Sequence, residues 1–182
     1  KYSEPKLNDK QSYTKVLENL LGEKNISGFS FISEQYDHEV QASSVLKPLS
    51  GPGRINTDAQ VFRPVLNSNK GVILSSATYP SYGDISAYHM AACALDAAIR
   101  NVVASGGTIK HLAILDNFCW CSSTAPERLG QLKAAVQACY DLAVAYGTPF
   151  ISGKDSMFND FKGFDANNKP TTLSIPPTLI VS

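Results

Sequence analysis

The sequence predicts an α/β (α+β) domain, in which a mixed sheet carries two long helices packed on one face. Two observations support this fold class. Apolar residues recur at helical spacing over about 84–104 and 125–146, a pattern that indicates two long amphipathic helices. Short apolar runs precede, separate and follow these stretches, and they give the element order β-β-α-β-α-β-β. That order is typical of helices layered on a sheet.

The composition disfavours several classes of protein. The chain has 182 residues, of which 43% are hydrophobic and 18% charged, enough to bury one sizeable core. Sixteen Lys and Arg residues balance sixteen Asp and Glu residues, whereas proteins that bind nucleic acids usually carry a basic excess. No apolar run is long enough to predict a membrane-spanning helix. The polar N-terminus lacks the apolar stretch of a signal peptide, so we expect a cytoplasmic protein with no nucleic-acid or membrane partner.

The first stretch of the chain is predicted to be a linker with one short helix. Residues 1–32 are largely polar, but apolar positions on one face indicate a helix over 12–22, with Ser12 as its cap. A second short helix is expected to run toward Tyr36. The domain itself is expected over 33–182, and the chain is expected to be a fragment of a larger protein.

Turn and cap residues bound the first elements of the domain. Residues 59–65 and 71–76 indicate two strands joined by a turn, and hence an antiparallel hairpin. Asp84 is the predicted cap of the first long helix. Gly106 and Gly107 are expected to end that helix.

Similar residues bound the second long helix. Ser123 or Thr124 is its predicted cap and Gly147 its stop. Trp120, shortly before this helix, is expected to cover the core rather than to stack on a base. A polar excursion is expected over 157–174. The strands around the helix are predicted at 109–115, 148–151 and 176–182.

Two of the predicted strands end in short polar loops. Asp116 and Asn117 follow the strand at 109–115, and the run S-G-K-D-S at 152–156 follows the strand at 148–151. Ligands tend to bind at the carboxyl ends of strands in open α/β sheets. We therefore expect these two loops to form one candidate site.

The residue types in these loops fit a phosphorylated ligand with magnesium. Asp116 and Asp155 are candidate Mg²⁺ ligands, because Mg²⁺ prefers carboxylate oxygens. Lys154 can neutralise phosphate, and Ser152 or Ser156 can donate a hydrogen bond to it. The alternative interpretation is a solvated turn with a surface pair of lysine and aspartate.

Five runs of residues occur in an order that one known family shares. They are Q-Y-D-H-E-V-Q at 35–41, A-I-R-N-V-V-A-S-G-G at 98–107, L-D-N-F-C-W at 115–120, Y-G-T-P-F-I-S-G-K-D-S-M-F-N at 146–159 and S-I-P-P-T-L at 174–179. Together they resemble phosphoribosylformylglycinamidine synthase, the ATP-dependent amidotransferase of purine biosynthesis. The resemblance covers about 33–182.

The resemblance implies a reaction and partners. Members of the family convert formylglycinamide ribonucleotide, glutamine and ATP to the amidine, ADP, phosphate and glutamate. Their synthetase part has two similar halves, each with an aminoimidazole ribonucleotide synthetase-like N-terminal domain and a C-terminal domain, and the two N-terminal domains pair through their sheets. This chain resembles the N-terminal domain of the second half. The implied partners are the first half, the C-terminal domains and a glutaminase domain or subunit, and we expect the isolated chain to form a homodimer.

The resemblance also implies roles for residues of the two loops. Asp116 and Gly153 would lie at the nucleotide and Ser156 at the substrate, with ATP and Mg²⁺ as cofactors. Lys154 stands where many members carry an asparagine near Mg²⁺. Because a cation does not ligate Mg²⁺, we expect Lys154 to contact phosphate, and Asp116 and Asp155 remain the candidate metal ligands.

The main catalytic histidine of the family has no counterpart here. It lies in a Ser-His-Asn-His-Pro segment of the first half, and the corresponding stretch at 75–80 is S-S-A-T-Y-P. We therefore assign no catalytic residue and expect the chain to be inactive alone. The missing histidine and Lys154 favour an alternative, a structural pairing domain with a degenerate nucleotide site. A further alternative is an adenylating domain of the ATP pyrophosphatase type, whose loop resembles 152–156 but follows an early strand and opens a helix.

Overall fold

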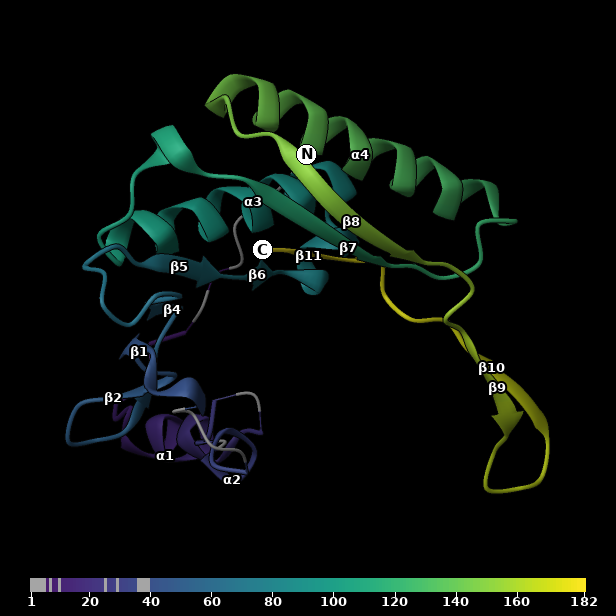
Figure 1. The fold of residues 1–182 in the computed structure, drawn as a ribbon. Helices are drawn as coiled ribbons and strands as arrows, with labels where there is room; N and C mark the ends of the chain where they lie inside the picture. Colours follow the sequence, from purple (N-terminus) through teal and green to yellow (C-terminus); the bar gives the residue numbers. More distant parts are fainter. Residues whose placement is uncertain (1–5, 7, 10, 25, 29, 36–39) are drawn as a thin grey trace. The chain divides into compact units, whose positions relative to one another are not determined.

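The computed structural model describes residues 6, 8–9, 11–24, 26–28, 30–35 and 40–182 (Figure 1). The chain divides into two compact units, residues 1–37 and 38–182. None of the helices in the described part of the chain has both the length and the apolar character needed to cross a membrane.

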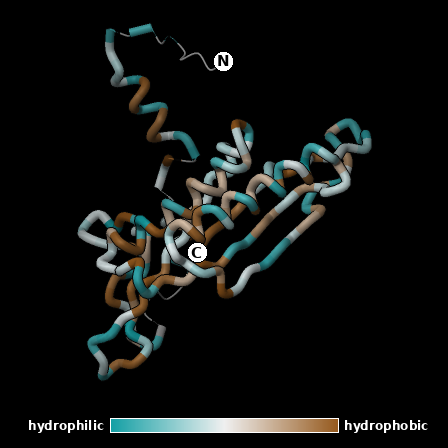
Figure 2. The backbone as a smooth tube through the Cα atoms, turned by 90° about the horizontal axis from the view of Figure 1, so that it is seen from above, coloured by the Kyte–Doolittle hydropathy of each residue, from teal (hydrophilic) through white to brown (hydrophobic). Residues whose placement is uncertain are grey.

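The first unit contains two short helices. Helix α1 spans Thr14–Gly22, as its apolar positions predict, and Figure 2 shows brown and teal patches alternating along it. The cap position is Tyr13 and not Ser12, whose hydroxyl instead accepts a hydrogen bond from the backbone N–H of Thr14 at 3.3 Å. Helix α2 is a single turn, Ser30–Ser33, and Tyr36 lies outside the described residues.

The second unit begins with short strands. After the 3-10 turn η1 (Val40–Ala42), strands β1, β4 and β5 form an antiparallel sheet in the order β1-β4-β5. Strands β4 and β5 are the predicted hairpin, and β4 ends before Pro64, which has no N–H to donate to a ladder. Strands β2 and β3 pair with each other, and β1 to β3 were not predicted. The bounds are β1 Ser44–Leu46, β2 Leu49–Ser50, β3 Ile55–Asn56, β4 Ala59–Phe62 and β5 Val72–Ser75.

Four strands form the main sheet, in the order β6-β11-β7-β8. Strands β7 and β8 are parallel, and β11 runs antiparallel to its neighbours β6 and β7. The predicted mixed sheet is confirmed. The bounds are β6 Ala77–Thr78, β7 Ile114–Cys119, β8 Phe150–Ser156 and β11 Thr178–Val181.

Two long helices cover one face of this sheet, as predicted (Figure 1). Helix α3 spans Ala87–Ala104 and α4 spans Pro126–Tyr146. Their buried alanines let the backbones approach closely, and the larger side chains of the core come mainly from the strands and the segment after β7. The buried core includes Met90, Ala91, Ala94, Leu95, Ile114, Phe118, Trp120, Ala135, Ala138, Leu179 and Val181.

The starts of both helices differ from the prediction. Residues 80–84 form a separate 3-10 turn, η2 (Pro80–Asp84), after which the chain becomes extended at Ser86. Ser86, not Asp84, caps α3 by accepting a hydrogen bond from the backbone N–H of His89 at 3.4 Å. The cap position of α4 is Ala125, without a side-chain hydrogen bond, so neither serine nor threonine caps it.

The helix ends agree with the prediction. Gly106, with φ of +92°, lies just beyond α3, and Gly147 ends α4 in the left-handed conformation, with φ of +67°. Residues 109–111, predicted as strand, form the 3-10 turn η3 (Ile109–His111). The predicted polar excursion contains an antiparallel hairpin of β9 (Phe161–Phe164) and β10 (Pro170–Leu173).

A polar cluster joins the two helices and makes a pH-dependent contribution to stability. The hydroxyl of Tyr146 in α4 donates to Oδ1 of Asp96 in α3 at 2.5 Å, and Nε of Arg100 donates to Oδ2 at 2.5 Å. The Tyr146 hydrogen bond first, and then that of Arg100, lower the pKa of Asp96. A carboxyl with a lowered pKa stabilises the fold above its unfolded pKa, and this stabilisation is lost as the pH falls through the folded pKa.

We therefore expect Asp96→Asn to lower the free energy of unfolding at pH 7 by about 1 kcal/mol, because a charge-assisted but partly exposed hydrogen-bond pair is weakened. Urea unfolding measured between pH 2 and pH 7 checks this. The variant should lose less stability than the original chain on acidification. Parallel stability curves for the two proteins would contradict the assignment.

Candidate functional site

The predicted site residues lie on two neighbouring parallel strands rather than on loops. Strand β7 extends through Asp116 and Asn117, and β8 extends through the whole run 152–156. The prediction that both strands end before these residues is wrong, and so is the interpretation of 152–156 as a solvated turn. The reason is the β7–β8 ladder, which pairs the polar residues with each other.

Asp116 and Gly153 lie directly opposite each other in this ladder. The carboxyl group of Asp116 leans over the backbone of Gly153. A Cβ atom added at Gly153 would lie 2.7 Å from both Cγ and Oδ2 of Asp116, well inside van der Waals contact. Glycine is therefore what permits the carboxylate to occupy this position.

Asp116 points toward the helix-covered face of the sheet. Successive side chains of a strand point to opposite faces, and Ile114 and Phe118, two residues on either side, lie in the core. The proximity of α4 is independent evidence, because burial first, and then the charge of Asp116, raise the pKa of the Cys139 thiol in α4 to about 12.

A second carboxylate lies on the same face. Asp155 is two residues after Gly153 and lies opposite Phe118 in the ladder. Burial first, and then the negative charge of Asp155, raise the pKa of Asp116. Both causes disfavour the charged form of Asp116, and a cation bound between the carboxylates would relieve their repulsion.

Lys154 and Ser156 are joined to each other on β8. They lie across from Asn117 and Cys119, and the alternation of the strand directs them to the open face of the sheet, away from Asp155. The Nζ of Lys154 donates a hydrogen bond to the Oγ of Ser156. A cation and a hydroxyl held together can bind an anion such as phosphate. The structure thus brings Asp116, Gly153 and Asp155 together on one face and Lys154 with Ser156 on the other.

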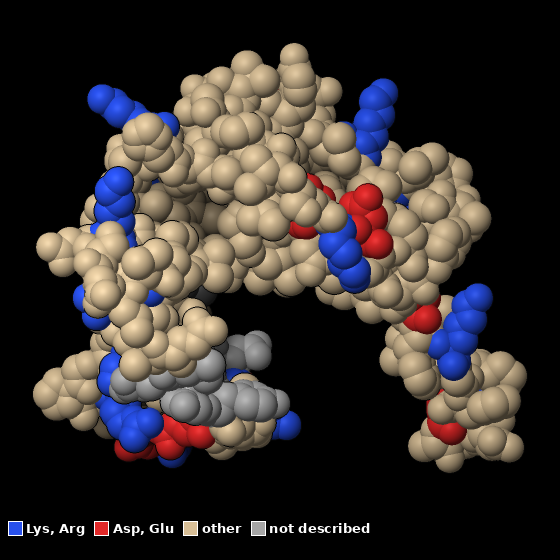
Figure 3. Space-filling view, in the orientation of Figure 1, with Lys and Arg blue, Asp and Glu red and all other residues tan. Residues whose placement is uncertain are grey.

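Figure 3 shows acidic side chains next to a basic one over the carboxyl-terminal part of β7 and β8. In the sequence of β8, Lys154 and Asp155 are exposed neighbours that contribute charges of both signs to this part of the sheet. Among the described residues, no group of three or more His, Cys, Asp and Glu side chains could hold a metal ion by itself. A metal at this sheet would therefore need ligands beyond the two carboxylates.

Backbone hydrogen bonds join the segment after β7 to the end of β8 and to the segment that follows it. The backbone N–H of Trp120 donates to the carbonyl of Ser156 at 2.7 Å, and that of Asn159 donates to the carbonyl of Trp120 at 3.0 Å. The indole Nε1 donates to the carbonyl of Arg128 in α4 at 3.0 Å. Trp120 is fully buried, in agreement with its predicted place in the core.

Asp160 was not predicted to be a functional residue. Its Oδ2 accepts a hydrogen bond from the backbone N–H of Ser122 at 2.9 Å, so it joins the segment after β8 to the start of α4. Its Oδ1 is buried and has no hydrogen-bond partner among the described residues. The sequence offered one signal for it, since Asp160 is the first carboxylate after the polar run at 152–156. Of the motif at 35–41, residues 36–39 lie outside the described residues.

Several known proteins are similar to this chain in sequence. Residues 56–174, more than half of the chain, match the AIR synthase related protein family, N-terminal domain. The phosphoribosylformylglycinamidine synthase subunit PurL of Thermococcus sibiricus is 32% identical over 171 residues, which are 94% of this chain and 21% of the relative. The same subunit of Pyrococcus abyssi is 33% identical over 82% of this chain and 19% of the relative. The chain thus spans about a fifth of the length of these curated relatives.

Solved structures share the fold. The structure of PurLQS from Thermotoga maritima has a TM-score of 0.66 at 24% identity, over 85% of this chain and 23% of that chain. T. maritima PurL complexed with ATP has a TM-score of 0.61 at 23% identity, over 85% and 22%. T. maritima PurL complexed with FGAR has a TM-score of 0.62 at 24% identity, also over 85% and 22%. The match over 56–174 shows that the chain belongs to the family of AIR synthase related proteins, of which it is an N-terminal domain.

Proposed function

We propose that the chain is a nucleotide-binding N-terminal domain of phosphoribosylformylglycinamidine synthase, within the second half of the synthetase part. The intact enzyme would amidate formylglycinamide ribonucleotide with glutamine as the nitrogen donor and ATP as the energy source, a step of purine biosynthesis. The similarity in sequence to phosphoribosylformylglycinamidine synthase subunits supports the proposal of this amidation reaction. The main observation in support of a nucleotide-binding role is that the Asp116 carboxylate lies over Gly153. Only glycine leaves room for the carboxylate there.

The helix face of β7 and β8 is the proposed nucleotide site, with Asp116 and Gly153 at the nucleotide. Asp116 and Asp155 fit a shared Mg²⁺ ion, since their repulsion already raises the pKa of Asp116. Mg²⁺ is commonly bound by one or two carboxylates together with substrate phosphates and water. The two carboxylates match such an ion, carried in by a nucleotide, better than an all-protein metal site. Related proteins from T. maritima have been solved with ADP and with ATP.

The open face of the same strands is the proposed place for contacts with phosphate and substrate. Lys154, with its positive charge, would contact phosphate, and the neighbouring Ser156 would contact substrate. The hydrogen bond between them supports a shared role. The separation of these residues from Asp116 by the thickness of the sheet implies that two ligand groups, rather than one, are bound.

The proposed partners are the other domains of the enzyme. They are the first synthetase half, the C-terminal domains and a glutaminase domain or subunit, in a cytoplasmic enzyme. The similarity to PurLQS from T. maritima supports a multi-component assembly. The isolated chain, over the proposed domain 33–182, would form a homodimer through its open sheet face, which a monomer mass in light scattering at high concentration would refute. It would show no ATP-dependent turnover with ammonia.

A structural role is the second candidate. The stretch 75–80 has no histidine, and Lys154 occupies a position expected near Mg²⁺. A pairing domain with a degenerate nucleotide site would keep the fold but bind no nucleotide. Nucleotide titration separates the two functions directly.

Calorimetric titration of the chain with ATP in the presence of Mg²⁺ tests the proposal. We expect saturable binding that disappears when Mg²⁺ is chelated. Asp116→Asn should weaken it at least tenfold, which corresponds to a loss of about 1.4 kcal/mol, because a charged ligand of the ion is removed. Ser156→Ala, on the other face, should weaken ATP binding much less.

The matched control is Asp58→Asn, which removes one exposed carboxylate directly before β4, in the sheet β1-β4-β5 and not in the main sheet. It should leave ATP binding unchanged. Equal affinities for the original chain and Asp116→Asn would remove Asp116 from the site. Absence of any binding, also after the first synthetase half is added, would favour the structural role.

A further inference from the structure

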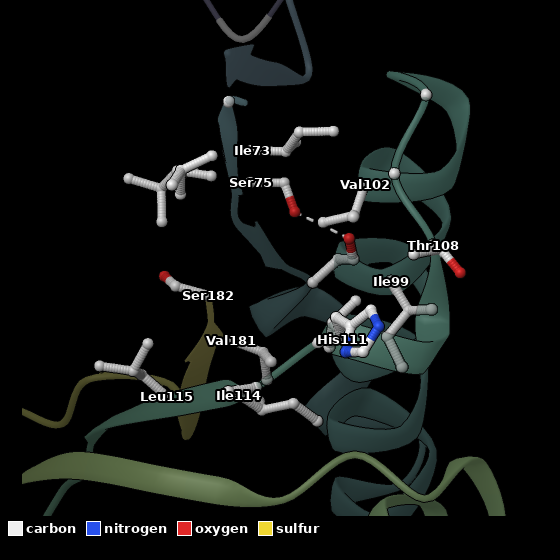
Figure 4. A pocket seen from close by; sticks show the side chains of 18 residues that line it. Ile73, Ser75, Ile99, Val102, Thr108, His111, Ile114, Leu115, Val181 and Ser182 are labelled. Carbon is white, nitrogen blue, oxygen red and sulfur yellow. Dashed lines mark hydrogen bonds between the residues drawn. The ribbon is translucent and has the colours of Figure 1, made fainter. Parts of the chain in front are cut away.

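A groove opens beyond the end of β11, away from the proposed nucleotide site. Its volume is about 510 Å³, and it lies between β5, the end of α3 and the start of β7. Figure 4 shows Ile73 and Ser75 on one side, Ile114 and Leu115 on the other, and Ser182 between them at the end of β11. The groove thus begins where the described strand β11 ends.

Two backbone edges face this groove. Strand β5 pairs with β4 on one side only, and no strand of the described residues pairs with its other edge. Strand β7 keeps its partner β11 up to Leu115, whose N–H and C=O both bond to Ser182, at 2.8 and 3.0 Å. The residues just before Leu115 have β8 on one side and no strand partner in the described chain on the other. Backbone groups left without partners favour the addition of a strand.

An extension of β11 in its present register would enter this groove. Strand β6, which pairs Ala77 with Val181, follows β5 after a single residue. Inward and outward residues alternate without interruption from Val72 to Thr78, so no bulge separates β5 from β6. A chain extended past Ser182 would therefore lie opposite Ser75 at its first residue and opposite Ile73 at its third.

The hydrogen-bond pattern of this added strand can be derived. In an antiparallel pair, residues that exchange both hydrogen bonds alternate with residues that exchange none. Because Leu115 exchanges both with Ser182, the second residue of the extension would exchange both with Ala113. On the other edge, its first and third residues would bond to Ser75 and Ile73. The side chains of these two residues would point toward α3, into the groove.

The lining of the groove favours an apolar strand over an anionic ligand. None of its 18 lining residues is Lys, Arg, Asp or Glu. The wall consists largely of aliphatic side chains such as Ile99 and Val102 (Figure 4), and Ser75 already donates its hydroxyl to the carbonyl of Ala98 at 2.7 Å. A phosphate group would find no Lys or Arg here and only the imidazole of His111, whereas alternate apolar side chains would be buried.

We propose that the groove holds an extended, alternately apolar strand that continues β11 past Ser182 and joins the sheet β1-β4-β5 to the main sheet. The relatives are more than four times as long as this chain, so they have polypeptide that can supply such a strand. The proposal does not depend on the nucleotide site. It predicts that the two sheets become one continuous sheet when the strand is present.

The test adds six residues after Ser182. One version carries Val-Thr-Val-Thr-Val-Thr, which directs valine into the groove at the first and third positions. The control carries Thr-Val-Thr-Val-Thr-Val, which has the same composition but is shifted by one residue, so that valine faces the open side. Backbone hydrogen exchange is measured at Ile73, Ser75 and Ala113, together with thermal unfolding.

The in-register extension should slow exchange at these three amides at least tenfold and raise the Tm by about 4 °C or more. The shifted control should do neither. The same exchange rates and Tm for both versions would overturn the proposal. Protection that appears only at high protein concentration would assign the strand to a second copy and would also overturn the in-line placement.

Discussion

Gly153→Ala is expected to destabilise the chain by about 1–3 kcal/mol, the usual cost of forcing an extra methyl group into occupied space. The added Cβ would lie 2.7 Å from Cγ and Oδ2 of Asp116. The carboxyl group would have to rotate away from its position over the strand. In a strand without this contact, alanine would instead stabilise by about 0.5–1 kcal/mol relative to glycine, because it has less conformational freedom to lose.

A double-mutant cycle with Asp116→Ala isolates this contact. In the Asp116→Ala background, Gly153→Ala should be neutral or stabilising, since no carboxyl group remains to collide with the methyl group. Urea unfolding of the four proteins gives the coupling free energy, which should reach about 1–3 kcal/mol. Equal effects of Gly153→Ala in both backgrounds would show that Asp116 does not lie over Gly153. Under the proposed function, Gly153→Ala should also weaken Mg²⁺-dependent ATP binding at least tenfold.

The long helices and the first hairpin could be predicted because their signals are local. Helical spacing over α3 and α4 and the turn between β4 and β5 depend on residues near in sequence. Gly147 ended α4 as expected, because the left-handed conformation favours glycine. The residues that cap the starts of α3 and α4 were predicted wrongly. The 3-10 turn η2, which begins at Pro80, ends at Asp84 and leaves Ser86 as the cap of α3.

The extent of β7 and β8 could not be predicted, because it depends on pairing between distant residues. Polar residues such as Asp116 and Lys154 usually indicate a loop, but here they lie in the ladder of two parallel strands. The same wrong prediction explains why one site was expected where the structure divides these residues between two faces of the sheet. Residues of a loop can converge on one ligand, whereas consecutive strand residues must point to opposite faces.

The pKa of Asp116 shows what its position costs the fold. Burial and the neighbouring Asp155 both raise that pKa, so the folded chain binds a proton more readily than the unfolded chain does. Stability therefore falls as the pH rises from the unfolded pKa through the folded one. A carboxylate kept at such a cost is typical of binding sites. This physical reason supports the proposed position of the nucleotide on the helix face rather than beside Lys154.

Trp120→Ala is expected to have the largest effect on stability, a loss of about 3–5 kcal/mol. The side chain is fully buried, its ring centroid lies 5.9 Å from that of Phe118, and its Nε1 bonds to the carbonyl of Arg128. Truncation leaves a large cavity where β7 meets α4. Because folded domains are stable by only about 5–15 kcal/mol, this single change can take up much of the stability. Urea unfolding followed by far-UV circular dichroism measures it, since the variant lacks the only tryptophan of the chain.

Trp120→Phe is the matched control, and it separates packing from the hydrogen bond. Phenylalanine fills most of the indole volume but cannot donate a hydrogen bond to the carbonyl of Arg128. We therefore expect a loss of about 1–2 kcal/mol, a fraction of the alanine effect. Equal losses for the two variants would mean that the hydrogen bond, not the buried ring, holds the segment. Because the backbone of Trp120 bonds to Ser156 and Asn159, the alanine variant should also speed hydrogen exchange at Asn159, whereas the phenylalanine variant should leave it protected.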